Sequence, residues 1–449
     1  MSSLSAGFGL IEITPLVGTP LIGQLYPRYS TGVHDPLFAR VLALRDGEDD
    51  ALRDGEDEAP REDDANAVMI IVLDVCKVPE YDADRIRDAI VAKLPIPRDR
   101  IWVFATHTHT GPALHTSGET PRADKYATWL HGEVARAAAT AWEDLAPATV
   151  KFVQTDVDGV GFVRRYRMKD GSVRTNPGVG NPDIVEPTRR PRTRFSIVEF
   201  ERDPTRLPIV FGAYPCHADV VGGLDASADY PGRVCSELTH RIDTHPESIF
   251  ALGPCGDINH IDVNANERLG GHEHAQKMAR TLVDAALGVW DKREKIDGAL
   301  DIRRTKLTVS RRDVTDEQIA EAKALIARET KPGGESSTEV VFARGMLLVT
   351  ELPLEIEIEI CAVVIGEVAI VCLPGELFSE LAEKIEDASP FAHTFCVELL
   401  ASAEAGYIGT REAYAEGGYE TRPMPSSQFA PGTGERVVEE AVRLLNEKR

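Results

Sequence analysis

The sequence predicts an α/β fold built from mixed β-sheets that are flanked by helices. Short apolar runs alternate with amphipathic stretches of helical period along most of the chain. Late in the chain, one strand-like run follows another directly, which indicates sheets of mixed strand direction. Polar clusters stand just after several apolar runs, where α/β proteins commonly place their functional groups.

The first half of the chain alternates strands and helices. Short apolar runs predict strands, and apolar residues that recur at spacings of three and four predict amphipathic helices. The predicted strands are 68–76, 101–105, 195–200, 208–214 and 249–252, and the predicted helices are 82–94, 123–143, 231–243 and 273–290.

The second half adds two successive strands and three helices. A stretch with proline and glycine at 331–337 predicts a loop, and with the helix before it we expect a peripheral cap over about 310–340. No flexible linker divides the chain, so we expect a single catalytic domain over residues 1–449. The predicted strands are 356–364 and 368–373, and the predicted helices are 316–327, 376–386 and 434–446.

An acidic, internally repeated segment interrupts the apolar pattern at residues 45–65. Residues 44–50 read Leu-Arg-Asp-Gly-Glu-Asp-Asp, and residues 52–58 repeat them closely. The segment connects two apolar runs, so we interpret it as a solvated hairpin loop without a functional site. The alternative, a cation-binding loop, needs a longer and differently spaced ligand set.

Composition excludes several classes of function. Hydrophobic residues make up 43% of the 449 residues and charged residues 27%, as in globular proteins. The net charge of -23 argues against a nucleic-acid partner, because phosphate binding requires clustered lysine and arginine. No apolar run is long enough to span a bilayer and no secretion signal is present, so we expect a cytoplasmic location. The seven cysteines form no C-x-x-C pair and fit reduced core thiols.

Two histidines follow the predicted strand 101–105. His107 and His109 lie two residues apart within Thr-His-Thr-His-Thr-Gly-Pro, and in an extended segment such residues point to the same side. One imidazole could bind a metal while the other handles a proton, which predicts a metal site at the carboxyl ends of strands. The alternative is a polar strand end with two hydrogen-bonded histidines.

Four more polar residues follow strands or lie in turns. His217 comes just after a predicted strand, and Glu376 stands where the strand 368–373 gives way to a predicted helix. Tyr407 and Tyr419 lie in glycine-rich loops. Each also has a structural alternative. His217 could be a hydrogen-bonded core histidine, and Glu376 could be an acid that favours the helix dipole. The two tyrosines could simply pack in their turns.

Two other groups of residues offer weaker signals. Cys255 is a conceivable nucleophile with His260 as its base, but nothing in the sequence brings the two together. His272 and His274 fall in a predicted helix, where residues two apart do not share a face. We therefore expect a solvated helix start there rather than a metal site.

Taken together, the motifs resemble the N-terminal catalytic domain of the neutral/alkaline (non-lysosomal) ceramidase family. The similarity begins at residues 7–15 and extends to about Tyr419, so it covers nearly the whole chain. The order of the motifs and the twelve-residue spacing of the two tyrosines make the joint match specific. The motifs are Thr106-His107-Thr108-His109-Thr110-Gly111-Pro112, Val163-Arg164-Arg165, His217 with Asp229-Tyr230-Pro231-Gly232, Gly256-Asp257, Leu373-Pro374-Gly375-Glu376, and Tyr407 with Tyr419.

The resemblance implies a zinc site and a set of residues beside it. Two neutral imidazoles with hard oxygen ligands suit zinc and leave room for water or substrate. By resemblance, the zinc ligands are His107, His217, Glu376 and Tyr407, and the residues that contact the substrate carbonyl or oxyanion are His109, Arg164 and Tyr419.

The sequence also departs from the family pattern. Asn259 stands where the family carries a serine, which excludes a serine nucleophile and leaves a mechanism with metal-activated water. Val163 replaces the asparagine usual before the family arginine. The similarity does not extend to the family's C-terminal immunoglobulin-like domain, so we expect a member without it.

The resulting hypothesis is a zinc-dependent hydrolase that cleaves an amide bond of a small polar substrate, with the oligomeric state left open. The alternatives are an esterase, lactonase or lyase that uses the same site, a non-catalytic zinc-binding protein, and an enzyme that uses the Cys255 thiol.

Overall fold

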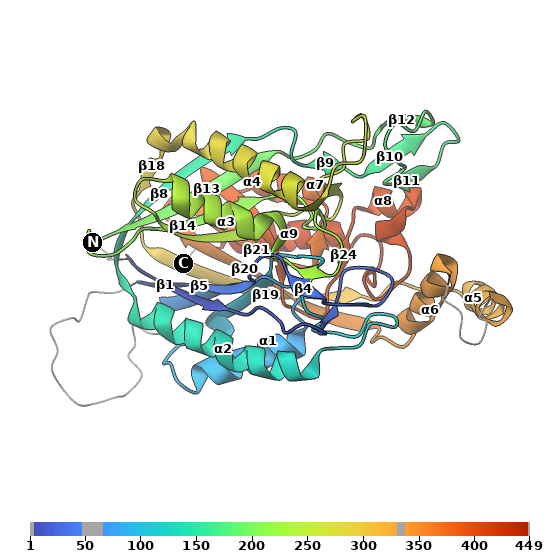
Figure 1. The fold of residues 1–449 in the computed structure, drawn as a ribbon, viewed down its shortest axis with the longest axis horizontal. Helices are drawn as coiled ribbons and strands as arrows, with labels where there is room; N and C mark the ends of the chain where they lie inside the picture. The colour runs from blue at the N-terminus through green and yellow to red at the C-terminus, as the bar shows by residue number, and fades with distance from the viewer. Residues whose placement is uncertain (1–3, 47–65, 330–336, 448–449) are drawn as a thin grey trace.

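A long mixed β-sheet runs through the protein (Figure 1). The computed structural model describes residues 4–46, 66–329 and 337–447. The sheet has 13 strands, of which β14–β16, β6–β7 and β21–β23 are parallel pairs. Their order is β16 (Glu247–Leu252), β14 (Ile209–Tyr214), β13 (Arg194–Arg202), β8 (Ala146–Asp156), β1 (Leu4–Glu12), β5 (Phe38–Asp46), β6 (Ala67–Leu73), β7 (Ile101–Ala105), β23 (His393–Leu400), β21 (Val368–Pro374), β20 (Glu355–Ile365) and β19 (Leu300–Ser310), with β18 (Glu294–Ile296) on β8.

Helices flank this sheet, and the predicted α/β class is confirmed. In Figure 1, α1 and α2 lie below the strands and α3 and α4 above them. The helices are α1 (Glu80–Val91), α2 (Asp124–Glu143), α3 (Asp229–Arg241), α4 (Gly271–Leu287), α5 (Asp316–Glu329), α6 (Thr338–Val349), α7 (Ser379–Asp387), α8 (Arg411–Glu416) and α9 (Thr433–Asn446).

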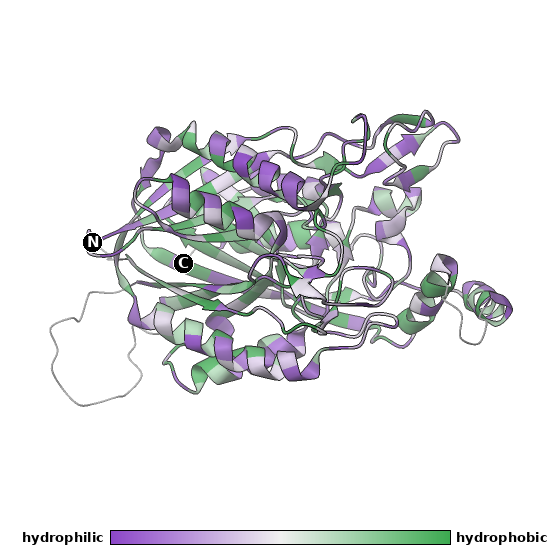
Figure 2. Cartoon of the chain, in the orientation of Figure 1, coloured by the Kyte–Doolittle hydropathy of each residue, from purple (hydrophilic) through white to green (hydrophobic). Residues whose placement is uncertain are grey.

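Three large apolar clusters form most of the core, and alternation along each strand assigns its residues to different clusters. In β7, Trp102 and Phe104 join a cluster made only of strand residues, so the two halves of the curled sheet pack face to face. Ile101 and Val103 point the other way, into a cluster shared with α1 to α4. A third cluster lies between α7, α9 and the strands β19 to β21. Figure 2 shows the hydrophobic strands inside and hydrophilic residues outward on α3 and α4.

Strand β1 was not predicted, because two glycines interrupt its apolar pattern. A Cβ on Gly7 would lie 2.0 Å from the Ala141 carbonyl oxygen, and one on Gly9 would lie 2.0 Å from that of Ala137. Glycine in a strand therefore marks the close approach of α2 to β1. Strands β8, β19 and β23 and helix α6 also differ from the predicted elements, whereas β7 has the predicted bounds.

Short strands add smaller pieces of sheet beside the main one. They are β2 (Pro20–Leu21) with β3 (Arg28–Tyr29), β4 (Gly32–Val33) with β15 (Asp225–Ala226), β9 (Phe162–Val163) with β17 (Ile258–Asn259), β10 (Arg165–Met168) with β11 (Val173–Thr175) and β12 (Ile184–Pro187), and β22 (Glu376–Leu377) with β24 (Tyr407–Ile408). Three 3₁₀ turns complete the described elements, at η2 (Arg98–Arg100), η3 (Trp290–Lys292) and η4 (Tyr419–Thr421).

The acidic repeat connects two neighbouring strands. Strands β5 and β6 pair antiparallel, with Arg45 opposite Ala67, so the two apolar runs are hairpin partners. Residues 47–65, which carry most of the predicted acidic loop, lie outside the described residues, and so do residues 331–336 of the loop predicted at 331–337.

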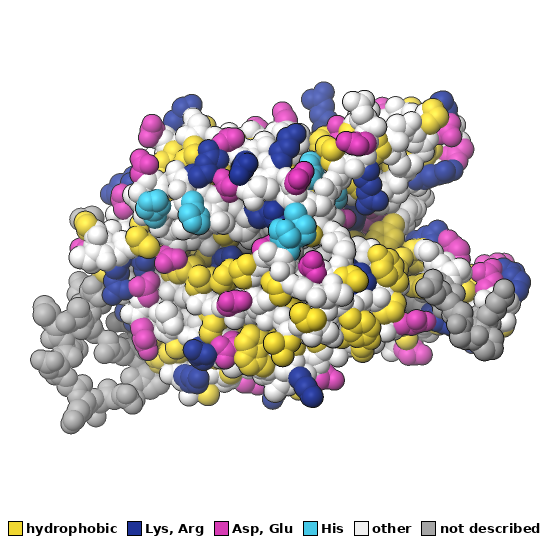
Figure 3. Space-filling view, in the orientation of Figure 1, with side chains coloured by type: hydrophobic (Ala, Val, Ile, Leu, Met, Phe, Trp, Pro, Cys, Tyr) yellow, Lys and Arg dark blue, Asp and Glu magenta, His cyan; other side chains and the backbone are white. Residues whose placement is uncertain are grey.

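Several apolar side chains of the segment before β5 remain on the surface. Leu16 is 84% exposed and Tyr26 60% exposed. Figure 3 shows hydrophobic side chains gathered over β4 and the loops beside it. Within the described part of the chain, none of the helices combines the length and apolarity that crossing a membrane requires.

Candidate metal centre

His107 leaves strand β7 through a strained backbone conformation. The strand ends at Ala105, and His107 has a φ of 63°, with its N–H bonded to the Val75 carbonyl at 2.9 Å. A bulky residue with positive φ is uncommon and tends to mark functional sites. His107 and His109 do converge, with their Nε2 atoms 3.2 Å apart. The expected reason was wrong, because the segment is left-handed at His107 rather than extended.

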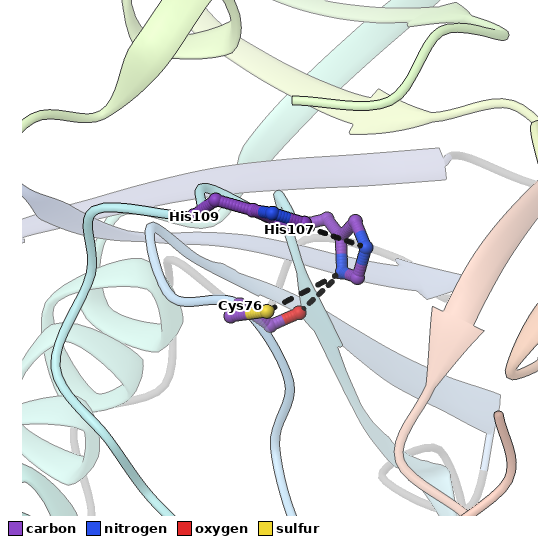
Figure 4. Close-up of side chains that lie close together, drawn as sticks. All are labelled: Cys76, His107 and His109. Carbon is purple, nitrogen blue, oxygen red and sulfur yellow. Dashed lines mark hydrogen bonds between the residues drawn. The ribbon is translucent and has the colours of Figure 1, made fainter. Parts of the chain in front are cut away.

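Backbone carbonyls set the tautomers of His107 and His217. The Nδ1 of His107 donates to the Cys76 carbonyl at 2.7 Å, and that of His217 donates to the Cys255 carbonyl at 3.0 Å. Figure 4 shows the contact between Cys76 and the His107 ring, with His109 beside the ring. A carbonyl can only accept, so each ring holds a proton on Nδ1 and directs Nε2, the atom that would bind a metal, into the cluster.

The two Nε2 atoms and one carboxylate oxygen face one another. The Nε2 atoms of His107 and His217 lie 3.2 Å apart. The Oε2 atom of Glu376 lies 3.2 Å from His217 Nε2 and 3.5 Å from His107 Nε2, and it is buried without a hydrogen-bond partner. Tetrahedral zinc with bonds of about 2.0–2.1 Å separates its ligand atoms by roughly 3.3–3.4 Å. This donor set therefore fits a zinc ion.

Tyr407 adds a phenol oxygen to the same cluster. Its hydroxyl lies 3.4 Å from His217 Nε2, and the two rings are stacked. Glu376 and Tyr407 are direct partners in the parallel pair of β22 and β24. Glu376 therefore belongs to a short strand, and the helix predicted from residue 376 begins instead at Ser379.

Two of the motif glycines allow backbones to meet at this site. A Cβ on Gly256 would lie 2.4 Å from the Glu376 carbonyl oxygen. Gly375 has a φ of 64°, and a Cβ there would lie 2.3 Å from the Gly406 carbonyl oxygen. Glycine is needed at both positions because the backbone beside Glu376 packs directly against the Gly256 turn and against the segment that carries Tyr407.

The electrostatics of the cluster favour a cation. Burial alone lowers the pKa of His107, but the Cys76 thiol and the Glu376 carboxylate outweigh burial and raise this pKa to about 10. Burial raises the pKa of Glu376, but His107 and His217 outweigh it and hold that pKa well below its usual range. The carboxylate is thus ionised, and without a metal a proton on His107 balances its charge.

His109 is held at the edge of the cluster. Its backbone N–H donates to the Ala218 carbonyl at 3.1 Å, and its own carbonyl accepts from Arg28. Gly23 has a φ of 105°, and a Cβ there would lie 2.6 Å from the ring of His109. Burial, and then the charge of His107, lower the pKa of His109 to about 3, so its imidazole is neutral at pH 7.

Tyr419 stands on the other side, next to Tyr407. The two rings form an edge-to-face pair with centroids 5.7 Å apart, and Phe342 of α6 contacts Tyr419 at a centroid distance of 6.1 Å. Burial raises the pKa of Tyr419 to about 12, so the phenol keeps its proton at neutral pH and can donate a hydrogen bond.

Arg164 is buried against Tyr407 with its donors directed at the protein. Its Nη2 donates to the Gly256 carbonyl at 2.6 Å, and its Nε lies 2.9 Å from Glu420 Oε1. The guanidinium carbon lies 5.1 Å from the centre of the Tyr407 ring. Only 4% of Arg164 is exposed, so its charge acts directly on the neighbouring Tyr407.

The structure brings together every residue that the resemblance selected, and it adds others that the sequence analysis missed. Glu420 pairs with Arg164, and Glu398 accepts a hydrogen bond from the N–H of Leu377, next to Glu376. The sequence offered one signal for Glu420, because it directly follows the motif residue Tyr419. The sequence offered no signal for Glu398, because its hydrogen bond with Leu377 depends on the packing of β22 against β23.

The residues behind the thiol alternative have other partners. The Cys255 thiol lies 3.0 Å from Glu398 Oε1, and burial raises its pKa well above the usual value. His260 pairs with Asp219 at 3.2 Å. A buried, protonated thiol is a poor nucleophile. Asn259 is also engaged, since its Nδ2 donates to Asn176 at 2.9 Å.

Cys76 with His107 and His109 forms a group of possible metal ligands that overlaps this cluster, and a separate group lies toward the surface. His34 and His272 stack with ring centroids 3.4 Å apart, beside Asp35. Arg233 Nη2 lies 2.9 Å from both Asp35 Oδ2 and His272 Nδ1. This guanidinium already supplies the positive charge that the group would seek, so the group does not fit a metal site.

Comparisons with known proteins identify the fold. No family model matches the chain, and no curated protein matches it. The neutral ceramidase from Pseudomonas aeruginosa has a similar structure, with a TM-score of 0.71 and 15% identity over 99% of this chain and 74% of that chain. A ceramidase complexed with C2 has a TM-score of 0.72 and 14% identity over 99% of this chain and 75% of that one. The chain therefore has the fold of the neutral ceramidase structures.

Proposed function

We propose that the protein is a zinc-dependent hydrolase that cleaves an amide bond of a small substrate. The observation that carries the proposal is the convergence of His107 Nε2, His217 Nε2 and Glu376 Oε2, with both imidazole tautomers set for metal binding. The fold shared with ceramidase structures supports amide hydrolysis as the reaction.

In this proposal, His107, His217, Glu376 and Tyr407 hold the zinc ion. When bound, zinc supplies a Lewis acid and lowers the pKa of a water molecule to about 7. Burial raises the pKa of Tyr407 well above its usual value, and the Arg164 guanidinium opposes that effect. Arg164 thus acts through Tyr407, whose deprotonated form it stabilises.

In the proposed reaction, His109 transfers the proton and Tyr419 stabilises the negative charge that develops on the carbonyl oxygen. As the water oxygen adds to the amide carbon, neutral His109 accepts the proton that the water loses. The Tyr419 hydroxyl donates a hydrogen bond to the carbonyl oxygen as it gains negative charge. When the C–N bond breaks, His109 returns the proton to the leaving nitrogen, so that an amine and a carboxylate result.

The remaining expectations complete the proposal. The chain acts as one catalytic domain on a small-molecule substrate, in the cytoplasm and without nucleic acid. Helices α5 and α6 form the peripheral cap, and the contact of Phe342 with Tyr419 supports a role for it in shaping the pocket.

Elemental analysis combined with a substrate panel tests the function. Purified wild-type protein should contain about one zinc per chain and cleave chromogenic N-acyl amides faster than matched esters and lactones. Faster cleavage of the esters or lactones would instead indicate an esterase or a lactonase. A product formed without incorporation of labelled water oxygen would indicate a lyase, and zinc binding without any turnover would indicate a non-catalytic protein.

A further inference from the structure

Glu420 is a fully buried carboxylate shared by two consecutive arginines. Its Oε1 lies 2.9 Å from Arg164 Nε, and its Oε2 accepts a hydrogen bond from Arg165 Nη1 at 2.9 Å. The carboxylate is 0% exposed, and the two arginines are 4% and 2% exposed. Buried charges of this kind keep a defined geometry, because moving one leaves the others uncompensated.

The same carboxylate also fixes the turn that carries Tyr419. Thr175 Oγ1 donates to Glu420 Oε2 at 2.8 Å and accepts the backbone N–H of Tyr419 at 3.1 Å. Gly418 has a φ of 107°, and a Cβ there would lie 2.5 Å from Arg165 Nη1. The turn η4 therefore lies directly on the arginine pair, with Glu420 between them.

We propose that Glu420 is the positioning residue that sets Arg164 and Tyr419 relative to the metal ligands. Arg164, which pairs with Glu420, contacts the ring of Tyr407. Tyr419, which directly precedes Glu420 in the chain, contacts the same ring. The Glu420 carboxylate thus positions two groups. They are the Arg164 guanidinium, which lies beside the proposed zinc ligand Tyr407, and the Tyr419 phenol, which is proposed to bind the oxyanion. The inference rests on the proposed function.

Glu416 offers a matched control. It lies 3.4 Å from Arg165 Nη2 and 2.7 Å from Arg167 Nη1, at the end of α8. It belongs to the same ionic cluster, but neither of these contacts reaches Arg164 or Tyr419. Replacing it tests the general effect of weakening the cluster without releasing the proposed catalytic groups.

The test compares Glu420→Gln with Glu416→Gln and wild type, all loaded with zinc. Glu420→Gln should keep its zinc content, because the contacts of Glu420 go to Arg164, Arg165 and Thr175, and it reaches the proposed ligand Tyr407 only through Arg164 and Tyr419. Its kcat per bound zinc should fall roughly 10- to 100-fold, as for other supporting residues of metal sites, with KM little changed. Glu416→Gln should behave as wild type. A purely structural role would lower the folded fraction but not the kcat of each zinc-loaded molecule.

A second measurement does not depend on turnover. The affinity of the zinc-loaded proteins for acetohydroxamate, measured by calorimetry, reports the groups around the oxyanion position. It should weaken in Glu420→Gln and stay unchanged in Glu416→Gln. If wild type binds acetohydroxamate but hydrolyses nothing, the proposed function fails, and this affinity alone decides the role of Glu420.

Three outcomes would overturn the proposal. They are a Glu420→Gln variant equal to wild type, equal losses in both glutamine variants, and a wild type that neither turns over substrate nor binds acetohydroxamate. If Glu420→Gln does not fold, Thr175→Val decides, since it removes only the hydroxyl between Glu420 and the Tyr419 N–H. A smaller loss of kcat at full zinc content supports the proposal, and no loss refutes it.

Discussion

Glu376 and Tyr407 lie directly opposite each other in a parallel ladder of only two residues per strand. The backbone N–H of Glu376 bonds to the Gly406 carbonyl at 2.9 Å, which holds the two segments in register. Both oxygen donors of the proposed zinc site therefore come from one ladder, whereas the two imidazoles follow the ends of β7 and β14.

Replacing a proposed metal ligand should lower zinc content. His107→Ala or Glu376→Gln removes one of three converging donor atoms, and the loss in zinc affinity should exceed the roughly 10- to 100-fold typical of supporting residues. Elemental analysis after dialysis against a weak chelator measures it. His240→Ala, at an exposed position of α3, is the control. Full zinc retention in either ligand variant would contradict the assignment.

Replacing His109 should separate metal binding from rate. His109→Ala should keep its zinc and lose roughly 100- to 10,000-fold in kcat, as expected when a proton-transfer group is removed. Zinc content and steady-state kinetics on the same preparation check both parts. A His109→Ala variant without zinc would show that this imidazole is a ligand instead.

The Tyr419 hydroxyl should raise kcat but should not change the pH dependence of the rate below pH 10. Tyr419→Phe should lower kcat roughly 100- to 1000-fold, the usual effect of losing one oxyanion donor. Its pKa of about 12 means that the wild-type phenol stays protonated across this range. A pH–rate profile in which activity falls with an apparent pKa near 10 only when Tyr419 is present would contradict this.

The stability of the fold should depend on pH through His115. Burial, and then the nearby Lys77, lower the pKa of His115 to about 4, below its unfolded value of about 6.5. The neutral form is favoured in the folded state, so this contribution is complete above pH 6.5 and is lost as pH falls from 6.5 toward 4. The free energy of unfolding should drop less between pH 7 and pH 5 in His115→Gln than in wild type, as measured by urea denaturation. Identical drops would refute the prediction.

Replacing the acidic repeat should leave the site intact. Strands β5 and β6 pair up to Arg45 and Ala67, so a short turn in place of residues 47–65 can join them. Zinc content and kcat should stay within about twofold of wild type, because no residue of the proposed site comes from this segment. A folded but inactive variant would show that the repeat has a function.

The sequence by itself determined the elements that depend on local pattern. The apolar run of β7 and the helical period of α2 lie within single segments, so periodicity located both. Motif order selected the residues of the proposed site, because His107, His217, Glu376 and Tyr407 each stand in a recognisable stretch.

Only the tertiary structure decided how those residues meet. The left-handed turn at His107 is held by a carbonyl from the Val75 segment, and the ladder that carries Glu376 needs a partner segment near Tyr407. The link between Glu420 and Arg164 joins positions that are 256 residues apart (420 minus 164). Such contacts follow from strand pairing and burial between remote segments, and no local pattern of residues encodes them.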